Sequence, residues 1–409
     1  MSSATLIVEV LTEELPPKAL QALGEAFAAT LVAGLRTRDF AAADVKAIAY
    51  ATPRRLAVAI AGVLRTSPDK PYKQKLLPVA VAYDAAGAAT PALVKKLAAL
   101  GLADASSLKR EGDGKAAVLI HEGIAPGSTL AAGLQQALDK AIAELPIPKV
   151  MSYAGPGSYY NDEKFVRPAH GVLALHGADV VPVRALGLAS GRTTAGHRFL
   201  SRTDIAVATA DAYEETLRAE GKVIASFAAR RAQIVAALGK AANGATVIMP
   251  DALLDEVTAL VEWPVVYAGT FDGAFLAVPH ECLILTMQAN QRYFAIADPG
   301  GSLTNRFLLV ANLDPLDPSA LVQGNERVLR ARLADARFFF DQDRKTTLEA
   351  RVDRFRAIVF HHKLGTQADR MERTRFVAKA IAARIGADPA ASDRAALLAK
   401  ADLVTDMVG

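Results

Sequence analysis

The stretch TLIVEVLTEELPPKALQALGEAFAATLVAGLRTR, residues 5–38, decides the class of fold. Its first eight residues alternate and are rich in β-branched side chains, a pattern typical of a β-strand. Pro16 and Pro17 then pre-set the backbone for a helix start, and apolar residues recur after them at helical spacing. The stretch therefore predicts a strand followed directly by an amphipathic helix.

The alternation of strands and helices continues to about residue 147. Further strands are predicted in three apolar runs, at residues 54–63, 76–87 and 115–123. Helices are predicted at residues 90–102 and 128–145. Thr90 is placed as an N-cap and Gly101 as a C-cap.

The length and these patterns predict an α+β fold with several domains. A chain of 409 residues is too long for one ordinary core. The segment PIPKVMSYAGPGSYY (146–160) marks a boundary or an ordered loop, strands follow at 171–176 and 306–312, and the pattern after about residue 319 is almost wholly helical. We expect an N-terminal α/β domain at 1–147, a central α+β domain at 148–320, and an all-helical segment at 321–409.

Composition narrows the class of protein. Lys and Arg number 47 against 43 Asp and Glu, so the net charge of +4 is mild, but residues 324–376 are dense in arginine. Such patchy basicity points to an anionic partner more than the total charge does. The chain has no apolar run that could span a membrane, no basic head typical of a secretory signal, and one cysteine. We expect a soluble cytoplasmic protein.

The segment GNERVLRARLADARFFFDQD (324–343) sets arginines beside phenylalanines. On a helix the two kinds of side chain separate. The apolar stripe is formed by Leu329, Leu333, Ala336 and Phe340. The opposite face, a candidate RNA-binding surface, carries Arg327, Arg330 and Arg337. Arg332 falls inside the apolar stripe, which predicts a buried guanidinium paired with a carboxylate or, alternatively, in contact with an RNA phosphate.

Two motifs near strands are dense in polar side chains. FVRPAHGVLALHG (165–177) contains Arg167 and His170, and GRTTAGHRFLS (191–201) contains Arg192, His197 and Arg198. Loops beside strand ends commonly carry binding groups, and Arg and His donors suit a phosphate or a sugar. The alternative is a polar network that ties one loop to the sheet.

A third polar motif is TMQANQRYFAI (286–296). It supplies Gln288, Asn290, Arg292 and Tyr293 as candidate RNA-binding residues, because amides, a guanidinium and aromatic rings are what readers of single-stranded RNA use. The same side chains are common at interfaces between domains, so the chemistry leaves both interpretations open.

Motifs of known catalytic chemistry are missing from the sequence. Glycine-rich phosphate loops, the zinc-protease motif, paired C-x-x-C and the nucleophile elbow do not occur. His361 and His362 adjoin, but neighbours on a helix point about 100° apart and do not readily face one ion. We therefore predict no catalytic residue, no metal site and no cofactor in this chain.

Eight segments together resemble the β subunit of the bacterial tetrameric glycyl-tRNA synthetase. They run collinearly along the chain: VEVLTEELPPKAL (8–20), YATPRRLAV (50–58), FVRPAHGVLALHG (165–177), GRTTAGHRFLS (191–201), VEWPVV (261–266), ECLILTMQANQRYF (281–294), GNERVLRARLADARFFFDQD (324–343) and KLGTQADRMER (363–373). The resemblance covers essentially the whole chain. Because β chains of this family are longer, the sequence is expected to be an N-terminal fragment.

The resemblance implies a division of labour. A separate α subunit would bind ATP and magnesium and activate glycine, while the β subunit would bind tRNA(Gly) and complete an α2β2 heterotetramer. Residues at about 150–320 look similar to a domain of the phenylalanyl-tRNA synthetase β chain. Residues after about 345 look like the start of a degenerate HD-type helical domain, in which Ala401 stands where the metal-binding histidine is expected.

Two alternatives stand beside this interpretation. One is an active HD-type metal-dependent phosphohydrolase, which would need a divalent ion near His361, His362 and Asp402. The other is a scaffold that holds α subunits and never contacts RNA. Salt-dependent binding of tRNA would separate the scaffold from the synthetase subunit.

Overall fold

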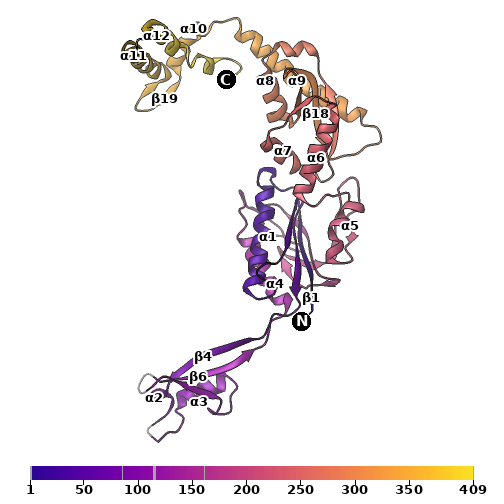
Figure 1. Ribbon diagram of the computed structural model, residues 1–409, viewed down its shortest axis with the longest axis vertical. Helices are drawn as coiled ribbons and strands as arrows, with labels where there is room; N and C mark the ends of the chain where they lie inside the picture. The colour runs from indigo at the N-terminus through magenta and orange to yellow at the C-terminus, as the bar shows by residue number, and fades with distance from the viewer. Residues whose placement is uncertain (1, 85, 114–116, 161, 409) are drawn as a thin grey trace. The chain divides into compact units, whose positions relative to one another are not determined.

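The computed structural model describes residues 2–84, 86–113, 117–160 and 162–408. The chain divides into two compact units, residues 1–229 and 230–409 (Figure 1). Both units mix helices and strands, which confirms the α+β class. The division into three domains at residues 147 and 320 stays a prediction, although the main sheet of the first unit joins strands from both sides of residue 147.

The first unit is built on a seven-stranded sheet. Its strands are β1 (Ser3–Thr12), β2 (Ala47–Thr52), β3 (Arg55–Leu64), β9 (Ala169–His176), β10 (Asp179–Val180), β11 (Arg184–Ala185) and β12 (Leu188–Gly191). The order is β11-β12-β9-β1-β3-β2, with β10 beside β9, and only the β12–β9 pair is parallel. The strand predicted at 5–11 is therefore the central strand of the sheet, and the strand predicted at 171–176 is its neighbour.

Helices cover both faces of this sheet. After a 3-10 turn at Pro17–Ala19, α1 (Leu20–Thr37) packs with α4 (Leu130–Ala143) on one side of β1, and α5 (Tyr213–Ala219) lies on the other (Figure 1). Helices α1 and α4 approach closely at Gly34, where an added Cβ would lie 2.7 Å from the Cβ of Ala137. The predicted strand–helix order at 5–38 is confirmed.

A smaller sheet is inserted between β3 and α4. It has the order β4-β6-β5, from β4 (Lys70–Pro78), β5 (Leu108–Glu111) and β6 (Val118–Ala125), and packs against α2 (Val79–Ala82) and α3 (Pro91–Ala99). The strand predicted at 76–87 is wrong beyond Pro78, because α2 buries Ala82 against this core and Asp84 then accepts two backbone hydrogen bonds in a turn. The alternation of residues in VAVA (79–82) did not by itself distinguish a strand from a helix.

Two short hairpins complete the first unit. They are β7 (Met151–Tyr153) with β8 (Glu163–Phe165), and β13 (Thr193–Thr194) with β14 (Ile205–Ala206). A 3-10 turn at Ala210–Ala212 leads into α5.

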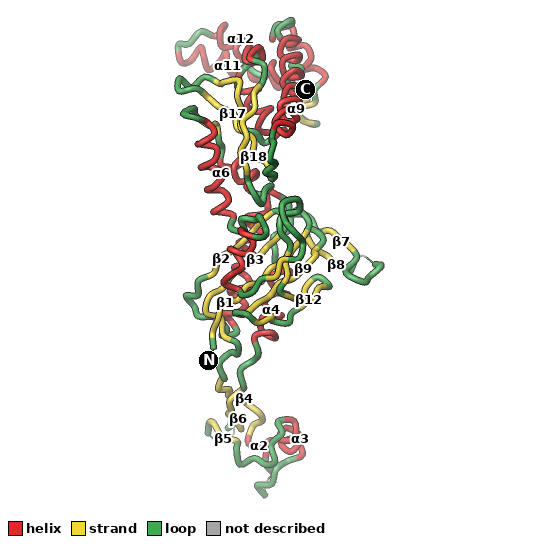
Figure 2. Tube along the Cα trace, turned by 90° about the vertical axis from the view of Figure 1, so that its right-hand side faces the viewer, coloured by secondary structure: helices red, strands yellow, loops and turns green. Residues whose placement is uncertain are grey.

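The second unit holds a four-stranded antiparallel sheet of order β15-β17-β18-β16. Its strands are β15 (Thr246–Ile248), β16 (Val265–Thr270), β17 (Phe294–Ala297) and β18 (Leu303–Ala311). α6 (Phe227–Ala242) and α7 (Asp251–Thr258) pack on one face, and α8 (His280–Leu285) and α9 (Ser319–Asp343) on the other (Figure 2). A 3-10 turn lies at Gly273–Ala277. β18 confirms the strand predicted at 306–312.

The chain after α9 is mostly helical but not wholly so. It contains α10 (Leu348–Arg351), a 3-10 segment (Val352–Ala357), β19 (Val359–His361), β20 (Gly365–Thr366), α11 (Gln367–Ile385), α12 (Pro389–Leu398) and a 3-10 turn (Ala401–Val404). The expectation of an all-helical segment is wrong at the β19–β20 hairpin. Gly365 allows this hairpin, because its φ of +87° suits a residue without a Cβ.

No helix in the described part of the chain has both the length and the apolar character that crossing a bilayer requires.

Candidate functional site

Four of the motifs meet at one end of the seven-stranded sheet. β1 ends at Thr12 beside Ala169, where β9 begins, and the turn between β2 and β3 lies next to them. Backbone hydrogen bonds join the segments: Glu13 N–H donates to Pro168 O at 2.9 Å, and Leu15 N–H donates to Pro53 O at 2.6 Å. Segments 12–17, 52–55 and 167–170 thus lie together, with buried residues such as Arg55 inside and exposed residues such as His170 at the surface.

A buried polar network lies beneath this surface. Glu9 and Arg55, 1% and 0% exposed, form an ion pair at 3.2 Å across β1 and β3. Thr194 and Tyr213 both donate hydroxyl hydrogen bonds to the Glu9 carboxylate, the latter at 2.5 Å. Burial, and after it the charge of Glu9, raises the pKa of Tyr213 well above its usual range, so the phenol stays a donor. The carboxylate is therefore held by charge and by hydrogen bonds together.

The two adjacent arginines of TPRR hold the loop that carries His197 and Arg198. Arg55 donates to the carbonyl oxygen of Ala195, and Arg54 donates to that of Gly196, each at 2.8 Å. Consecutive carbonyls of the loop are therefore fixed by consecutive residues of the β2–β3 turn. The network connects the sheet to the loop, as the alternative interpretation of these motifs expected.

At the surface, Glu13 contacts two of the predicted site residues, His170 and Arg198. Its carboxylate accepts from His170 Nε2 at 2.9 Å and from Arg198 at 2.8 Å, and Arg198 also reaches Glu14 at 3.2 Å. The hydrogen bond from Arg198, supported by that from His170, lowers the pKa of Glu13 to about 2. Arg167 donates to Glu14 O at 2.9 Å. A phosphate would have to compete with Glu13 for these donors.

Arg192 and His197 hold their own loop. Arg192 donates to the carbonyl oxygens of Ala178 at 2.9 Å and Ala208 at 3.4 Å. His197 is buried, and its Nδ1 accepts from the backbone N–H groups of Phe199 and Leu200, both at 3.2 Å. An RNA contact by either residue stays a prediction, and the burial of His197 weighs against one.

The predicted residues of the TMQANQRYFAI motif lie in and directly after a widened helical turn in the second unit. Thr286–Asn290 form a π-helical turn, and Arg292 after it has a positive φ of 57°. The Arg292 guanidinium donates to Glu256 at 3.0 Å and to Ala289 O at 2.6 Å. Gln288 donates to Ile248 O at 3.4 Å. Arg292 thus serves the backbone of its own turn, while Asn290 is exposed.

Tyr293 belongs to the core of the second unit. Its ring stacks on Phe307 with centroids 4.8 Å apart, and its hydroxyl donates to Asn325 Oδ1 at 2.6 Å. Burial raises the pKa of Tyr293 to about 12. Stacking on a base would require this ring to leave the core, so the structure gives no support to that role.

A cavity of about 240 Å³ opens beside Tyr293, and the sequence did not indicate it. Its walls are the end of α7 with the residues after it, the segment 291–293, the last three residues of β18 and the first turns of α9. Leu260 at its rim is 44% exposed. The lining is mainly apolar, with the amides of Gln291 and Asn325 among it. The only indication in the sequence was the neighbouring TMQANQRYFAI motif, which was predicted as a candidate RNA-binding segment.

The arginine face of α9 is exposed as predicted, at Arg327, Arg330 and Arg337. Arg337 lies 3.7 Å from Asp341, one turn along the helix. The predicted burial of Arg332 is wrong, because that residue is exposed. Only Leu329 and Leu333 of α9 are buried, and the side that Arg332 shares with Val328 and Phe339 faces solvent.

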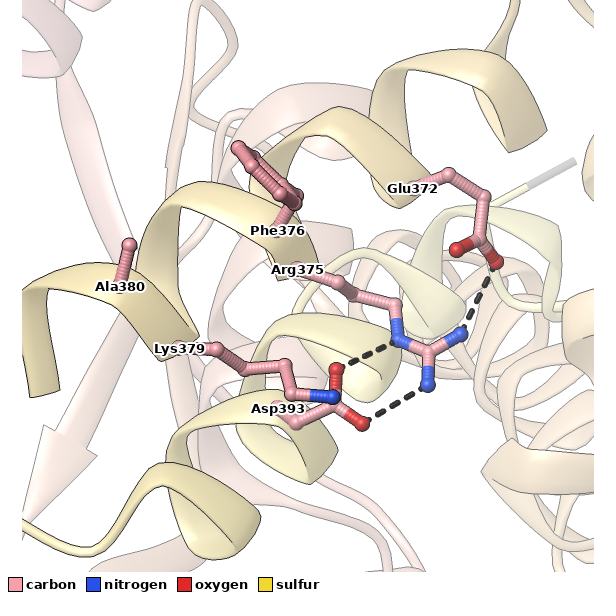
Figure 3. A pocket seen from close by; sticks show the side chains of 6 residues that line it. All are labelled: Glu372, Arg375, Phe376, Lys379, Ala380 and Asp393. Carbon is pink, nitrogen blue, oxygen red and sulfur yellow. Dashed lines mark hydrogen bonds and ion pairs between the residues drawn. The ribbon is translucent and has the colours of Figure 1, made fainter. Parts of the chain in front are cut away.

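A second concave surface lies between α11 and α12 (Figure 3). Arg375 spans it, donating to Asp393 at 2.8 Å and to Glu372 at 2.9 Å. The hydrogen bond to Asp393 raises the pKa of Arg375, and the same bond lowers the pKa of Asp393. Arg375 therefore ties the two helices together, and its charge is already matched by carboxylates.

Within the described residues, no three His, Cys, Asp or Glu side chains gather as a metal-binding group. His361 and His362 lie with ring centroids 6.4 Å apart. The absence of a metal site stays a prediction.

Comparison with known proteins gives the family. The family model described as "Glycyl-tRNA synthetase beta subunit" matches residues 6–409. The chain belongs to this family. The curated β subunits of Dechloromonas aromatica and Acidovorax ebreus are each 55% identical to it over 100% of the chain, and that of Ralstonia nicotianae is 53% identical over 99%. The chain spans 59–61% of the length of these relatives.

The family match covers both units and every motif named above. The segments TEELPP, TPRR, RPAH and TTAGHRF lie within the matched residues, and their side chains and backbones meet at the end of the first sheet.

Proposed function

We propose that this chain acts as the β subunit of a glycine–tRNA ligase, an aminoacyl-tRNA synthetase of protein biosynthesis. It would work in the cytoplasm with a separate α subunit, in an α2β2 complex, to attach glycine to tRNA(Gly) at the expense of ATP. One observation carries the proposal: β subunits named glycine–tRNA ligase are about 55% identical to the chain along its whole length.

The part assigned to this chain is contact with tRNA and assembly with the α subunit. The exposed face of α9 supports the RNA contact. Among the described residues, no hydrogen bond or ion pair joins the side chains of Arg327 and Arg330 to a carboxylate, so both charges are available to phosphates. Arg198 and His170 are less available to a phosphate, because Glu13 already accepts a hydrogen bond from each.

The chemistry is assigned to the α subunit. Activation of glycine requires bound ATP, neutralised phosphates and an oriented pyrophosphate leaving group. In this proposal ATP and magnesium bind to α, and no residue of this chain is given a catalytic role. Residues after about 345 are assigned to a degenerate HD-type domain that serves as scaffold, with Ala401 buried beside α10 and α12.

The test is glycine-dependent exchange between ATP and pyrophosphate. The purified chain alone should show no exchange at any protein concentration, whereas the α subunit added as a control should show it. Binding of a tRNA(Gly) transcript to the chain should weaken steeply as salt rises. Exchange by the chain without α would overturn the division of labour, and binding that ignores salt would remove the RNA contact.

A further inference from the structure

The cavity beside Tyr293 lies where one side of the second sheet is left open. β18 pairs with β16 as far as Ala311, but its pairing with β17 ends at Leu308. The edge of Leu309–Ala311 that would face β17 borders the cavity instead. A strand edge offers backbone donors and acceptors in addition to the apolar wall.

Of the two amide side chains that line the cavity, one is held in place and the other is not. Tyr293 donates to Asn325 Oδ1, and Asn325 Nδ2 donates to Leu321 O at 2.8 Å, so this amide is engaged on both atoms. Gln291 lines the cavity as well, and no hydrogen bond is found for its amide among the described residues. The Gln291 amide is therefore the side chain that can turn to a ligand.

The backbone at this point is strained and fixed. A non-glycine residue with positive φ is uncommon, and π-helical turns occur often at functional sites. Here Arg292 has a φ of 57° directly after the π-helical turn, and its contacts with Glu256 and Ala289 hold it there. Segment 291–293 forms part of the cavity wall directly after this turn.

Arg332 lies on α9 beyond the residues of that helix that line the cavity. Leu321 and Asn325 line it, and Val328 and Arg332 continue the same helix face at spacings of three and four residues. Val328 is 45% exposed and Arg332 is exposed. Because long side chains on a helix tend to lean toward its N-terminus, a guanidinium at position 332 is within the reach of a phosphate bound beside the cavity.

We propose that this cavity receives a single unstacked nucleobase of the bound RNA, an inference that rests on the proposed function. The base would pack against the apolar wall at Leu260 and Val310, its edge would meet the Gln291 amide and the open edge of β18, and its phosphate would meet Arg332. A volume of about 240 Å³ suits one base. An added peptide strand fits less well, because only three residues of β18 are open.

The experiment fills the cavity without touching a charge. Ala311→Phe places a ring in it, and Gln291→Ala removes the amide without adding bulk. Ala268→Phe, on an exposed position of β16, makes the same substitution away from the cavity. Affinity of each 409-residue variant for a tRNA(Gly) transcript is measured across a salt series, together with its melting temperature.

Both cavity variants should bind about tenfold more weakly. Ala311→Phe excludes the base from the apolar wall, and Gln291→Ala removes the hydrogen bond to its edge. Their slope of log K against log[salt] should not change. Arg332→Gln should instead lower the slope by about 0.7, the value for one phosphate of a single strand. The single tryptophan, Trp263, follows cavity-lining Val261 by two residues, so the transcript should quench its fluorescence in the parent and not in Ala311→Phe.

Three results would overturn the inference. Parent-like affinity in both cavity variants would leave RNA binding in place but remove the cavity from it. Unchanged RNA affinity together with loss of α-subunit binding, measured by co-purification of α with each variant, would assign the cavity to a protein partner. Absence of salt-dependent RNA binding in the parent chain would remove the proposed RNA contact and this inference together.

Discussion

The polar cluster of the first unit and the arginine face of α9 both carry arginine side chains, but they differ in whether a carboxylate pairs with them. At the end of the first sheet, Arg55 and Arg198 are each matched by a carboxylate, from Glu9 and Glu13 respectively. On α9, Arg330 projects into solvent with no such partner among the described residues. The comparison teaches that a motif dense in arginine does not by itself indicate unmatched charge, because carboxylates distant in the sequence can pair with it.

The largest effect is expected from Arg55→Met, which tests the buried ion pair of the first unit. The substitution leaves the Glu9 carboxylate buried without its cation, and removal of one partner of a buried pair costs about 3–5 kcal/mol. The free energy of unfolding, measured in urea on the first unit's transition, should fall by that amount. Arg330→Met is the matched control, and as an exposed substitution it should change stability by no more than about 0.5 kcal/mol.

A loss in Arg55→Met as small as in the control would mean that Glu9 is protonated or reached by water. The double variant Glu9→Leu, Arg55→Met tests whether the stranded charge causes the loss. It removes both charges, and it should regain much of the stability that Arg55→Met loses.

The second prediction concerns the Tyr213 hydroxyl, which donates to the Glu9 carboxylate. Tyr213→Phe removes the hydrogen bond to Glu9 while Arg55 and Thr194 stay in place, so the expected loss is about 1.5–3 kcal/mol, the range for a hydrogen bond to a charged group. Tyr159→Phe deletes a hydroxyl from a ring that is almost fully exposed and should have no measurable effect. Equal stability of the two variants would show that the Tyr213 contact contributes nothing.

The third prediction sharpens the comparison through RNA. If α9 meets a phosphate of a duplex, Arg330→Gln should lower the slope of log K against log[salt] by about 0.9 and weaken tRNA(Gly) binding several-fold. Arg198→Gln removes the same charge from a side chain already paired with Glu13, so its slope should equal that of the parent. A lower slope in Arg198→Gln and not in Arg330→Gln would reverse the assignment of the two surfaces.

The sequence predicted the elements better than the contacts. Periodicity located β1, α1, β9 and β18, because each has a strong pattern and one face packed on a core. Pattern failed at 79–82, where tertiary packing makes VAVA a helix. For Arg332, helical spacing located the apolar face of α9 correctly but predicted too wide a buried area. How much of a helix face a neighbouring element covers depends on that neighbour, and the sequence of the helix alone does not specify it.

The candidate site shows the same limit. The pairing of Glu9 with Arg55 was not predicted, because the two residues lie 46 positions apart, on β1 and β3. The cavity beside Tyr293 depends on where β17 stops along β18, a property of pairing that neither strand shows alone. Residues in contact within one segment could be predicted, whereas sites assembled from several segments needed the fold.

The smallest expected effect is the pH dependence of Glu13. Its pKa of about 2 in the folded chain lies below the ordinary value of 4.5, so its contacts with Arg198 and His170 stabilise the fold fully above about pH 4.5. That contribution is lost as the pH falls from 4.5 toward 2, because the unfolded chain takes up the proton first. Since the Glu13 side chain is 36% exposed, solvent screens the ion pair and the contribution should not exceed about 1 kcal/mol.

The measurement is the free energy of unfolding of the parent and of Glu13→Gln at pH 6 and at pH 3. At pH 6 the variant should be less stable by a few tenths of a kcal/mol up to about 1 kcal/mol, and at pH 3 the gap should narrow. Asp44→Asn, which changes an exposed carboxylate with no contact found for its side chain in the described residues, should follow the parent at both values. A gap that widens toward pH 3 would mean that Glu13 is protonated more readily in the folded chain than in the unfolded one, and the carboxylate could not then be the group that occupies Arg198.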